Sequence, residues 1–290
     1  MTENELYNKA QKPNEYFLVV MLLYRRLAFP LAVMFRRLGF SANQVTILGG
    51  CLWIISVVTM ISAAQSWINQ HYWSAVIQLG LTIFLWNFGF VLDVADGSLA
   101  RMTNTSSPAG SYLDYCFHLI FHPMFLCSIG IFLFIITGSL FYCIMGVLST
   151  FCGWGVSFSS KEHVLCESIA NGHHDPRKFN DDERYRIFID SVKSKTPATK
   201  KKNSELLITL LREFLCFPGQ YAFMSIVIIS DIILLHFINS NFILLQITFV
   251  AMVGVSLLRV PFRIKREFMT LVTYEKILKK NCDDRDNQQS

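Results

Sequence analysis

Charged residues are scarce in this sequence, and three long stretches have almost none. Of the 290 residues, 52% are hydrophobic and 16% are charged, whereas about a quarter of a soluble domain is charged. Residues 38–92 and 115–160 contain no Asp, Glu, Lys or Arg, and residues 214–258 contain only Asp231. Each stretch has room for two membrane spans of roughly 20 residues. The pattern predicts an all-α integral membrane protein with six transmembrane helices, and it excludes a disordered or coiled-coil chain.

The sequence also lacks closely spaced pairs of cysteines. The eight cysteines show no CxxC spacing, and most lie within the apolar stretches. This excludes a secreted disulfide scaffold and indicates that the cysteines are packing residues. We expect no separate signal peptide, because residues 1–15 are polar and have no apolar core. The first spans would then insert by themselves.

The basic residues predict which side of the membrane each connection faces. All 26 Lys and Arg residues lie outside the three apolar stretches. By the positive-inside rule, both termini, the segment around Arg101 and residues 159–217 lie on the cytoplasmic side of a bacterial inner membrane or an endomembrane. The net charge of +5 is therefore a topology signal. Without a basic, aromatic-interleaved motif it gives no reason to expect a nucleic-acid partner.

The same pattern divides the chain into five segments. Within the first, the apolar stretch 17–40 is interrupted by arginine pairs, which predicts an amphipathic helix in the membrane interface. We expect the second span to end near Leu92, and a loop that begins at Asp96-Gly97 to lead to a third span near Gly110. The expected segments are a cytoplasmic and interfacial segment 1–41, four transmembrane helices in 42–158 with the motif 93–118, a cytoplasmic connector 159–217, two transmembrane helices in 218–260 and a cytoplasmic tail 261–290.

Acidic residues gather at the inner end of the second span and at the start of the third. Asp93 and Asp96 lie three residues apart on one expected helix, and Asp114 and His118 lie four apart on the next. Each pair therefore shares a helix face. Three carboxylates at membrane depth repel one another unless a cation lies between them. This predicts a divalent metal site, and oxygen ligands favour Mg²⁺ or Mn²⁺.

Other residues of this stretch suit a phosphate ligand beside such a metal. Gly97 would let the chain leave the helix and approach a ligand closely. Arg101 offers a planar pair of donors to phosphate oxygens, and Gly110 stands where a helix N-terminus directs amides at an anion. Helix caps and an Arg–Asp pair would explain each residue alone but not the set. Together they predict a pyrophosphate site on a metal centre.

These residues resemble the signature of the CDP-alcohol phosphotransferases, also called CDP-alcohol phosphatidyltransferases. The signature Asp-Gly-x2-Ala-Arg-x8-Gly-x3-Asp-x3-Asp is matched by Asp96, Gly97, Ala100, Arg101, Gly110 and Asp114, with the family's additional carboxylate at Asp93. The run 103–108 resembles the choline and ethanolamine phosphotransferase branch, and residues 42–46 resemble the family's Pro-Asn-x-x-Thr start of the first span.

His118 is the one departure, because the family has its last Asp there. In the family that Asp is taken to deprotonate the acceptor hydroxyl, and it is also a candidate metal ligand. A neutral imidazole is able to do both, although it adds no negative charge. The sequence leaves three interpretations open. His118 is the base of an active enzyme, or it mainly ligates a metal while another group is the base, or the site is degenerate.

The resemblance implies a membrane transferase of phospholipid or membrane-linked glycan biosynthesis. Such an enzyme moves a substituted phosphate group from a CDP-alcohol to an acceptor alcohol and releases CMP, with two divalent ions, Mg²⁺ or Mn²⁺, at the diphosphate. The implied metal ligands are Asp93, Asp96, Asp114 and His118, and the implied catalytic residues are His118 and Asp114. The implied CDP-binding residues are Asn43, Thr46, Asp96, Gly97, Ala100, Arg101 and Gly110.

The acceptor and the partners are the least determined part of this interpretation. Arg259 and Arg263, at the inner end of the sixth span, either bind an anionic acceptor or anchor the helix at the interface. One of the two substrates is expected to be lipid-linked, and the resemblance suggests a homodimer. The alternative to catalysis is a degenerate family member that acts as a nucleotide- or lipid-binding protein or as a partner subunit.

Overall fold

The structure is a computed structural model that describes residues 3–10, 20–152, 217–237 and 241–289. The part so described consists of helices and their connections and contains no strand. It falls into two compact units that are divided after Leu257, and the candidate site lies entirely in the first.

Four of the described helices are long and apolar enough to cross a membrane, as expected of an all-α membrane protein. They are α3 (Ala42–Ile68), α4 (Tyr72–Thr103), α5 (Pro108–Thr137) and α11 (Ile243–Gln289), of which α11 is apolar enough over Ile243–Thr273. Two apolar helices are shorter, namely α6 (Leu140–Cys152) and α10 (Phe217–Phe237). Of the six expected spans, the described residues thus support four, and the other two stay a prediction.

The first long helix begins at a strong capping signal. Ser41 has an extended backbone, and its hydroxyl accepts a hydrogen bond from the Gln44 amide at 3.3 Å. The Gln44 side chain in turn accepts from the Ser41 amide at 2.9 Å. This reciprocal capping box fixes the first turn of α3. It thereby sets the positions of Asn43 and Thr46, which lie within or next to that turn.

α3 packs against both α4 and α5. The indole of Trp53 donates to the carbonyl of Trp86 at 3.0 Å, which ties α3 to α4. Gly89 makes this approach possible, since a Cβ there would lie 2.6 Å from Trp53 Nε1. Tyr221 of α10 stacks beside the same Trp53 ring at a centroid distance of 6.1 Å. Close helix contact at small residues is typical of packing in membranes.

α4 is longer than the sequence predicted. The expected loop at Asp96-Gly97 was wrong, because the helix continues to Thr103. The end of the membrane span near Leu92 stays a prediction. Its buried face continues through Leu99 and Met102, which pack in the core. The helix ends at Asn104, whose φ of 58° places it in the left-handed region. Gly97 is therefore a residue inside a helix and not a point where the chain leaves one.

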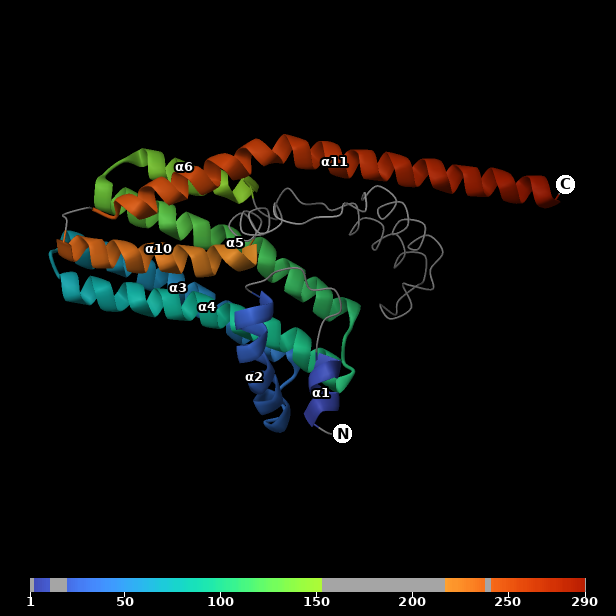
Figure 1. The fold of residues 1–290 in the computed structure, drawn as a ribbon, viewed down its shortest axis with the longest axis horizontal. Helices are drawn as coiled ribbons and strands as arrows, with labels where there is room; N and C mark the ends of the chain where they lie inside the picture. Colours follow the sequence, from blue (N-terminus) through green and yellow to red (C-terminus); the bar gives the residue numbers. More distant parts are fainter. Residues whose placement is uncertain (1–2, 11–19, 153–216, 238–240, 290) are drawn as a thin grey trace, which may run out of the picture. The chain divides into compact units, whose positions relative to one another are not determined.

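A helix is present where the interfacial helix was expected. A π-helical turn at Val20–Tyr24 leads into α2 (Arg25–Arg37), which is steeply inclined to α3 and α4 (Figure 1). Ala28, Ala32 and Phe35 form its buried face, which packs on α4. Tyr24 donates to Asn87 Oδ1 at 2.7 Å. Burial raises the pKa of the Tyr24 hydroxyl, so it remains a hydrogen-bond donor at neutral pH.

Asp231 makes a polar contact between two helices. From α10 its carboxylate accepts hydrogen bonds from the amides of Leu244 at 3.1 Å and Leu245 at 2.7 Å. Both amides belong to the first turn of α11, where no intrahelical partner exists for them. Asp231 therefore caps α11 and is fully buried in doing so.

Candidate metal and nucleotide site

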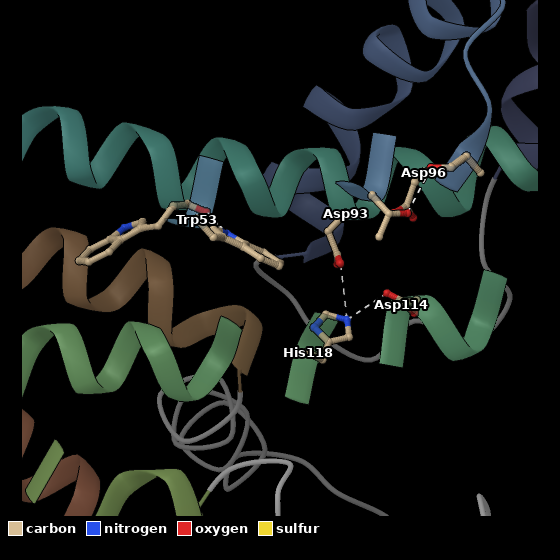
Figure 2. A network of polar contacts seen from close by, with 8 residues as sticks. Trp53, Asp93, Asp96, Asp114 and His118 are labelled. Atoms are coloured by element: carbon tan, nitrogen blue, oxygen red, sulfur yellow. Dashed lines mark hydrogen bonds and ion pairs between the residues drawn. The ribbon is translucent and has the colours of Figure 1, made fainter. Parts of the chain in front are cut away.

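Two facing helices bring three of the expected ligands together. Asp93 comes from α4, and Asp114 and His118 come from α5 (Figure 2). His118 Nε2 lies 3.5 Å from Asp93 Oδ1 and 3.3 Å from Asp114 Oδ1. The i,i+4 spacing of Asp114 and His118 places both on the same face of α5, as the sequence predicted.

The donor set of these three residues suits a divalent cation. One ligand atom from each of Asp93, Asp114 and His118 lies within 4.8 Å of the other two. The Asp93 and His118 side chains are 12% and 13% exposed, and the Asp114 side chain is 47% exposed. Carboxylate oxygens and an imidazole nitrogen are common ligands of divalent metals. The cluster therefore has a sheltered side and an open side, and Asp114 lies on the open one.

Asp96 lies apart from this group. Its buried carboxylate accepts a hydrogen bond from the hydroxyl of Thr46 on α3. In Figure 2 the Asp96 side chain stands apart from the contact between Asp93 and His118. The sequence placed all four ligands at one centre, whereas the structure groups three and pairs Asp96 with a residue expected to bind CDP. The metal role of Asp96 stays a prediction.

Arg101 is held by the N-terminal helix. Its Nε donates to the carbonyl of Ala10 at 2.8 Å, and its Nη2 lies 3.3 Å from Ser98 Oγ. Ala10 is the last residue of α1 (Glu3–Ala10). A Cβ at Gly97 would lie 3.2 Å from Arg101 Nη1. Gly97 thus leaves room for the guanidinium beside the helix, and the preceding Ala100 is half-buried on α4.

Asn43 and Gly110 meet although they come from different helices. α5 begins at Pro108, and its cap Ser107 accepts a hydrogen bond from the Gly110 amide at 3.1 Å. A Cβ at Gly110 would lie 3.4 Å from Asn43 Oδ1. The first turn of α5 and the first turn of α3 therefore lie side by side. Ser before Pro is a recognised helix start, so the sequence did hold the signal for Ser107.

A contact between two buried polar residues near the site could not be predicted from the sequence. His122 lies one turn after His118 on α5, and its Nε2 is 2.9 Å from Gln220 Oε1 of α10. Both side chains are buried. No sequence signal links residues 98 positions apart, so only the fold reveals that α10 supports this part of α5.

The remaining predictions lie elsewhere in the chain. Arg259 is exposed and Arg263 is partly buried on the part of α11 that belongs to the second unit. Their acceptor-binding role stays a prediction. The connector 159–217 and the expected end of the fourth span near Phe158 fall outside the described residues, save for Phe217, with which α10 begins.

Comparison with protein families shows what the part of the chain that carries this site is similar to. Residues 40–172 match the sequence model of the CDP-alcohol phosphatidyltransferase family. This range contains every candidate site residue from Asn43 to His118. These residues are therefore similar to the CDP-alcohol phosphatidyltransferases, a family in which divalent-metal dependence is general. A comparison with curated proteins found no match.

Proposed function

We propose that this protein transfers a substituted phosphate group from a CDP-alcohol to an acceptor alcohol and releases CMP. The observation that carries the proposal is the convergence of Asp93, Asp114 and His118 within the matched domain. Two further pairs, Thr46 with Asp96 and Asn43 with Gly110, link α3 to the two helices that hold the cluster. The likeness to the family supplies the reaction, and these contacts between the candidate side chains support the proposal.

The donor would be held between the metal ligands and the first turns of α3 and α5. Asn43, Thr46 and Gly110 would contact the cytidine and its ribose, and the amides at the start of α5 would face negative charge. Arg101 would act from the end of α4, close to the diphosphate. Divalent ions held by Asp93, Asp114 and His118, with Asp96 nearby, would supply neutralisation of the diphosphate charge.

The roles left open for His118 and Asp114 are assigned from their contacts. The same ring atom of His118, Nε2, approaches the carboxylates of both Asp93 and Asp114. A nitrogen in that position suits a metal ligand. Asp114 is the most exposed of the three side chains, so an acceptor hydroxyl would reach it most easily. We therefore assign metal ligation alone to His118, and proton acceptance in addition to metal ligation to Asp114.

The reaction then balances as a single displacement. The acceptor hydroxyl would give its proton to the Asp114 carboxylate, and its oxygen would form a bond to the β-phosphorus. The bond between the β-phosphorus and the bridging oxygen would break, and its electron pair would leave with CMP. Positioning of the two substrates and stabilisation of charge provide most of the rate in such transfers.

The membrane arrangement follows from the same helices. α6 and α10 would complete six spans with the four long helices, and α2 would lie in the cytoplasmic interface with its arginines near the headgroups. The site would then open at the cytoplasmic rim, where a soluble CDP-alcohol and a lipid-linked partner are able to meet. This arrangement supports a role in phospholipid or membrane-linked glycan biosynthesis. The expected homodimer stays a prediction.

Release of CMP tests the proposal. Purified protein in lipid nanodiscs would be mixed with a panel of CDP-alcohols, each with alcohol acceptors and a divalent metal, and CMP would be measured by chromatography. The account expects CMP from at least one pair, a loss of more than 100-fold in Asp114→Asn, and full activity in His71→Asn, which changes an exposed histidine outside the site. Cytidine nucleotide binding without CMP release from any pair would favour the non-catalytic alternative.

A further inference from the structure

We infer that the site formed by Asp93, Asp114 and His118 selects a first-row transition-metal ion over Mg²⁺. The inference rests on the proposed function for the need for a divalent ion, and it adds the class of that ion. The reason is the nitrogen that His118 places among two carboxylates.

The geometry gives the nitrogen a direct place in the donor set. His118 Nε2 is 3.3 Å and 3.5 Å from the nearest oxygens of Asp114 and Asp93. A cation held by the two carboxylates would therefore also meet the imidazole. Because the Asp93 and His118 side chains are only 12% and 13% exposed, bulk water has little access to this side of the site.

The chemistry of the ions decides which cation gains most from this set. Mg²⁺ is a hard ion that prefers oxygen ligands and gives up its water reluctantly. An imidazole nitrogen adds more to the binding of Mn²⁺, Co²⁺ or Zn²⁺, in an order that rises from Mn²⁺ to Co²⁺. An aspartate at position 118 would add an oxygen, which favours Mg²⁺, and a negative charge, which strengthens the binding of any divalent ion. The histidine removes both.

The first test compares two substitutions that separate donor type from charge. His118→Asn replaces the nitrogen ligand with a neutral oxygen, and His118→Asp replaces it with a charged one. Dissociation constants for Mg²⁺, Mn²⁺, Co²⁺ and Zn²⁺ would be measured by titration calorimetry on tag-free protein in detergent, without nucleotide. We expect the wild type to bind Co²⁺ at least 100-fold more tightly than Mg²⁺, and both variants to reduce that ratio at least tenfold. An unchanged ratio in both variants would overturn the inference.

A spectroscopic measurement on the wild type avoids dependence on the variants' folding. Pulsed electron paramagnetic resonance of bound Mn²⁺ detects modulation from a directly coordinated ¹⁴N. The wild type is expected to show this modulation, and His118→Asn is expected to lose it. His71→Asn is the matched control, because His71 is exposed and lies roughly 30 Å from Asp93 along α4. Wild-type Mn²⁺ without nitrogen modulation would contradict ligation by His118.

Failure of this inference and failure of the proposed function have different signatures. The metal titrations and the resonance spectra require no substrate. Selective binding of Co²⁺ without CMP release would refute the transferase and leave the metal site standing. CMP release that is supported best by Mg²⁺, together with equal affinities for Mg²⁺ and Co²⁺, would refute the metal selectivity and leave the transferase standing.

Discussion

The hydroxyl of Thr46 donates a hydrogen bond to the carboxylate of Asp96, across 50 residues of sequence. Thr46 lies in the second turn of α3 and Asp96 lies near the end of α4, and both are buried. The contact therefore holds the start of the first long helix against the helix that carries the acidic motif. It also brings together two residues of the expected nucleotide site that lie 50 positions apart in the chain.

Removal of this hydroxyl is expected to weaken both the fold and nucleotide binding. Thr46→Val keeps the shape of the side chain but leaves the buried Asp96 carboxylate without this donor, which costs about 1–3 kcal/mol. Thr46→Ser retains the hydroxyl and is the control. Chemical denaturation in detergent would measure the free energy of unfolding of the three proteins. Equal values for Thr46→Val and Thr46→Ser would show that the contact contributes nothing.

Two glycines of α4 are expected to respond in opposite ways to the same substitution. Gly89→Ala would place a methyl group 2.6 Å from Trp53 Nε1, so the indole would shift and lose its bond to Trp86. We expect a loss of about 1–3 kcal/mol. Gly80→Ala meets no atom within 4 Å and should leave stability unchanged or raise it by up to about 1 kcal/mol. Thermal melts of both variants would check the contrast, and equal behaviour would argue against the close approach of α3 and α4.

The cap on α11 offers a third test. Asp231→Ala removes the acceptor of the Leu244 and Leu245 amides and should lower stability by about 0.5–2 kcal/mol. Asp231→Asn retains one carbonyl oxygen and should lose less. Hydrogen exchange of the first turn of α11 would locate the effect. Faster exchange spread evenly over all helices would mean that Asp231 acts in some other way.

The contact between Arg101 and Ala10 predicts a link between the motif and α1. Arg101→Lys keeps the positive charge but removes the Nε donor that holds the Ala10 carbonyl. We expect faster hydrogen exchange in residues 3–10 and faster tryptic cleavage after Lys9. Arg26→Lys, on the exposed face of α2, is the matched control and should leave both unchanged. Slow exchange in Arg101→Lys would indicate that other contacts suffice to hold α1.

Much of the helical framework could be predicted because membrane spans have a plain physical signature. The charge-free stretches located α3, α4 and α5. The extension of α4 through Gly97 could not be predicted, because a glycine after an aspartate is equally typical of a helix end. Its buried neighbours Leu99 and Met102 decide the matter by packing, which only the fold reveals.

Part of the candidate site could likewise be predicted from the sequence, and part could not. Helical spacing was enough to place Asp114 and His118 on one face, and in the structure that face meets Asp93. The pairing of Asp96 with Thr46, by contrast, depends on how α3 crosses α4. The contact of Arg101 with Ala10 joins residues 91 positions apart and has no local pattern at all.

The measurement that tests the central claim most directly is the thermal stability of the purified protein with cytidine nucleotides. CMP, CDP and a CDP-alcohol would each be added with and without Mg²⁺ or Mn²⁺, because a ligand that binds the folded state raises the melting temperature. The account predicts a rise with CDP and the CDP-alcohol that requires the metal and is smaller in Asp96→Asn. No rise with any cytidine nucleotide, with or without metal, would contradict it.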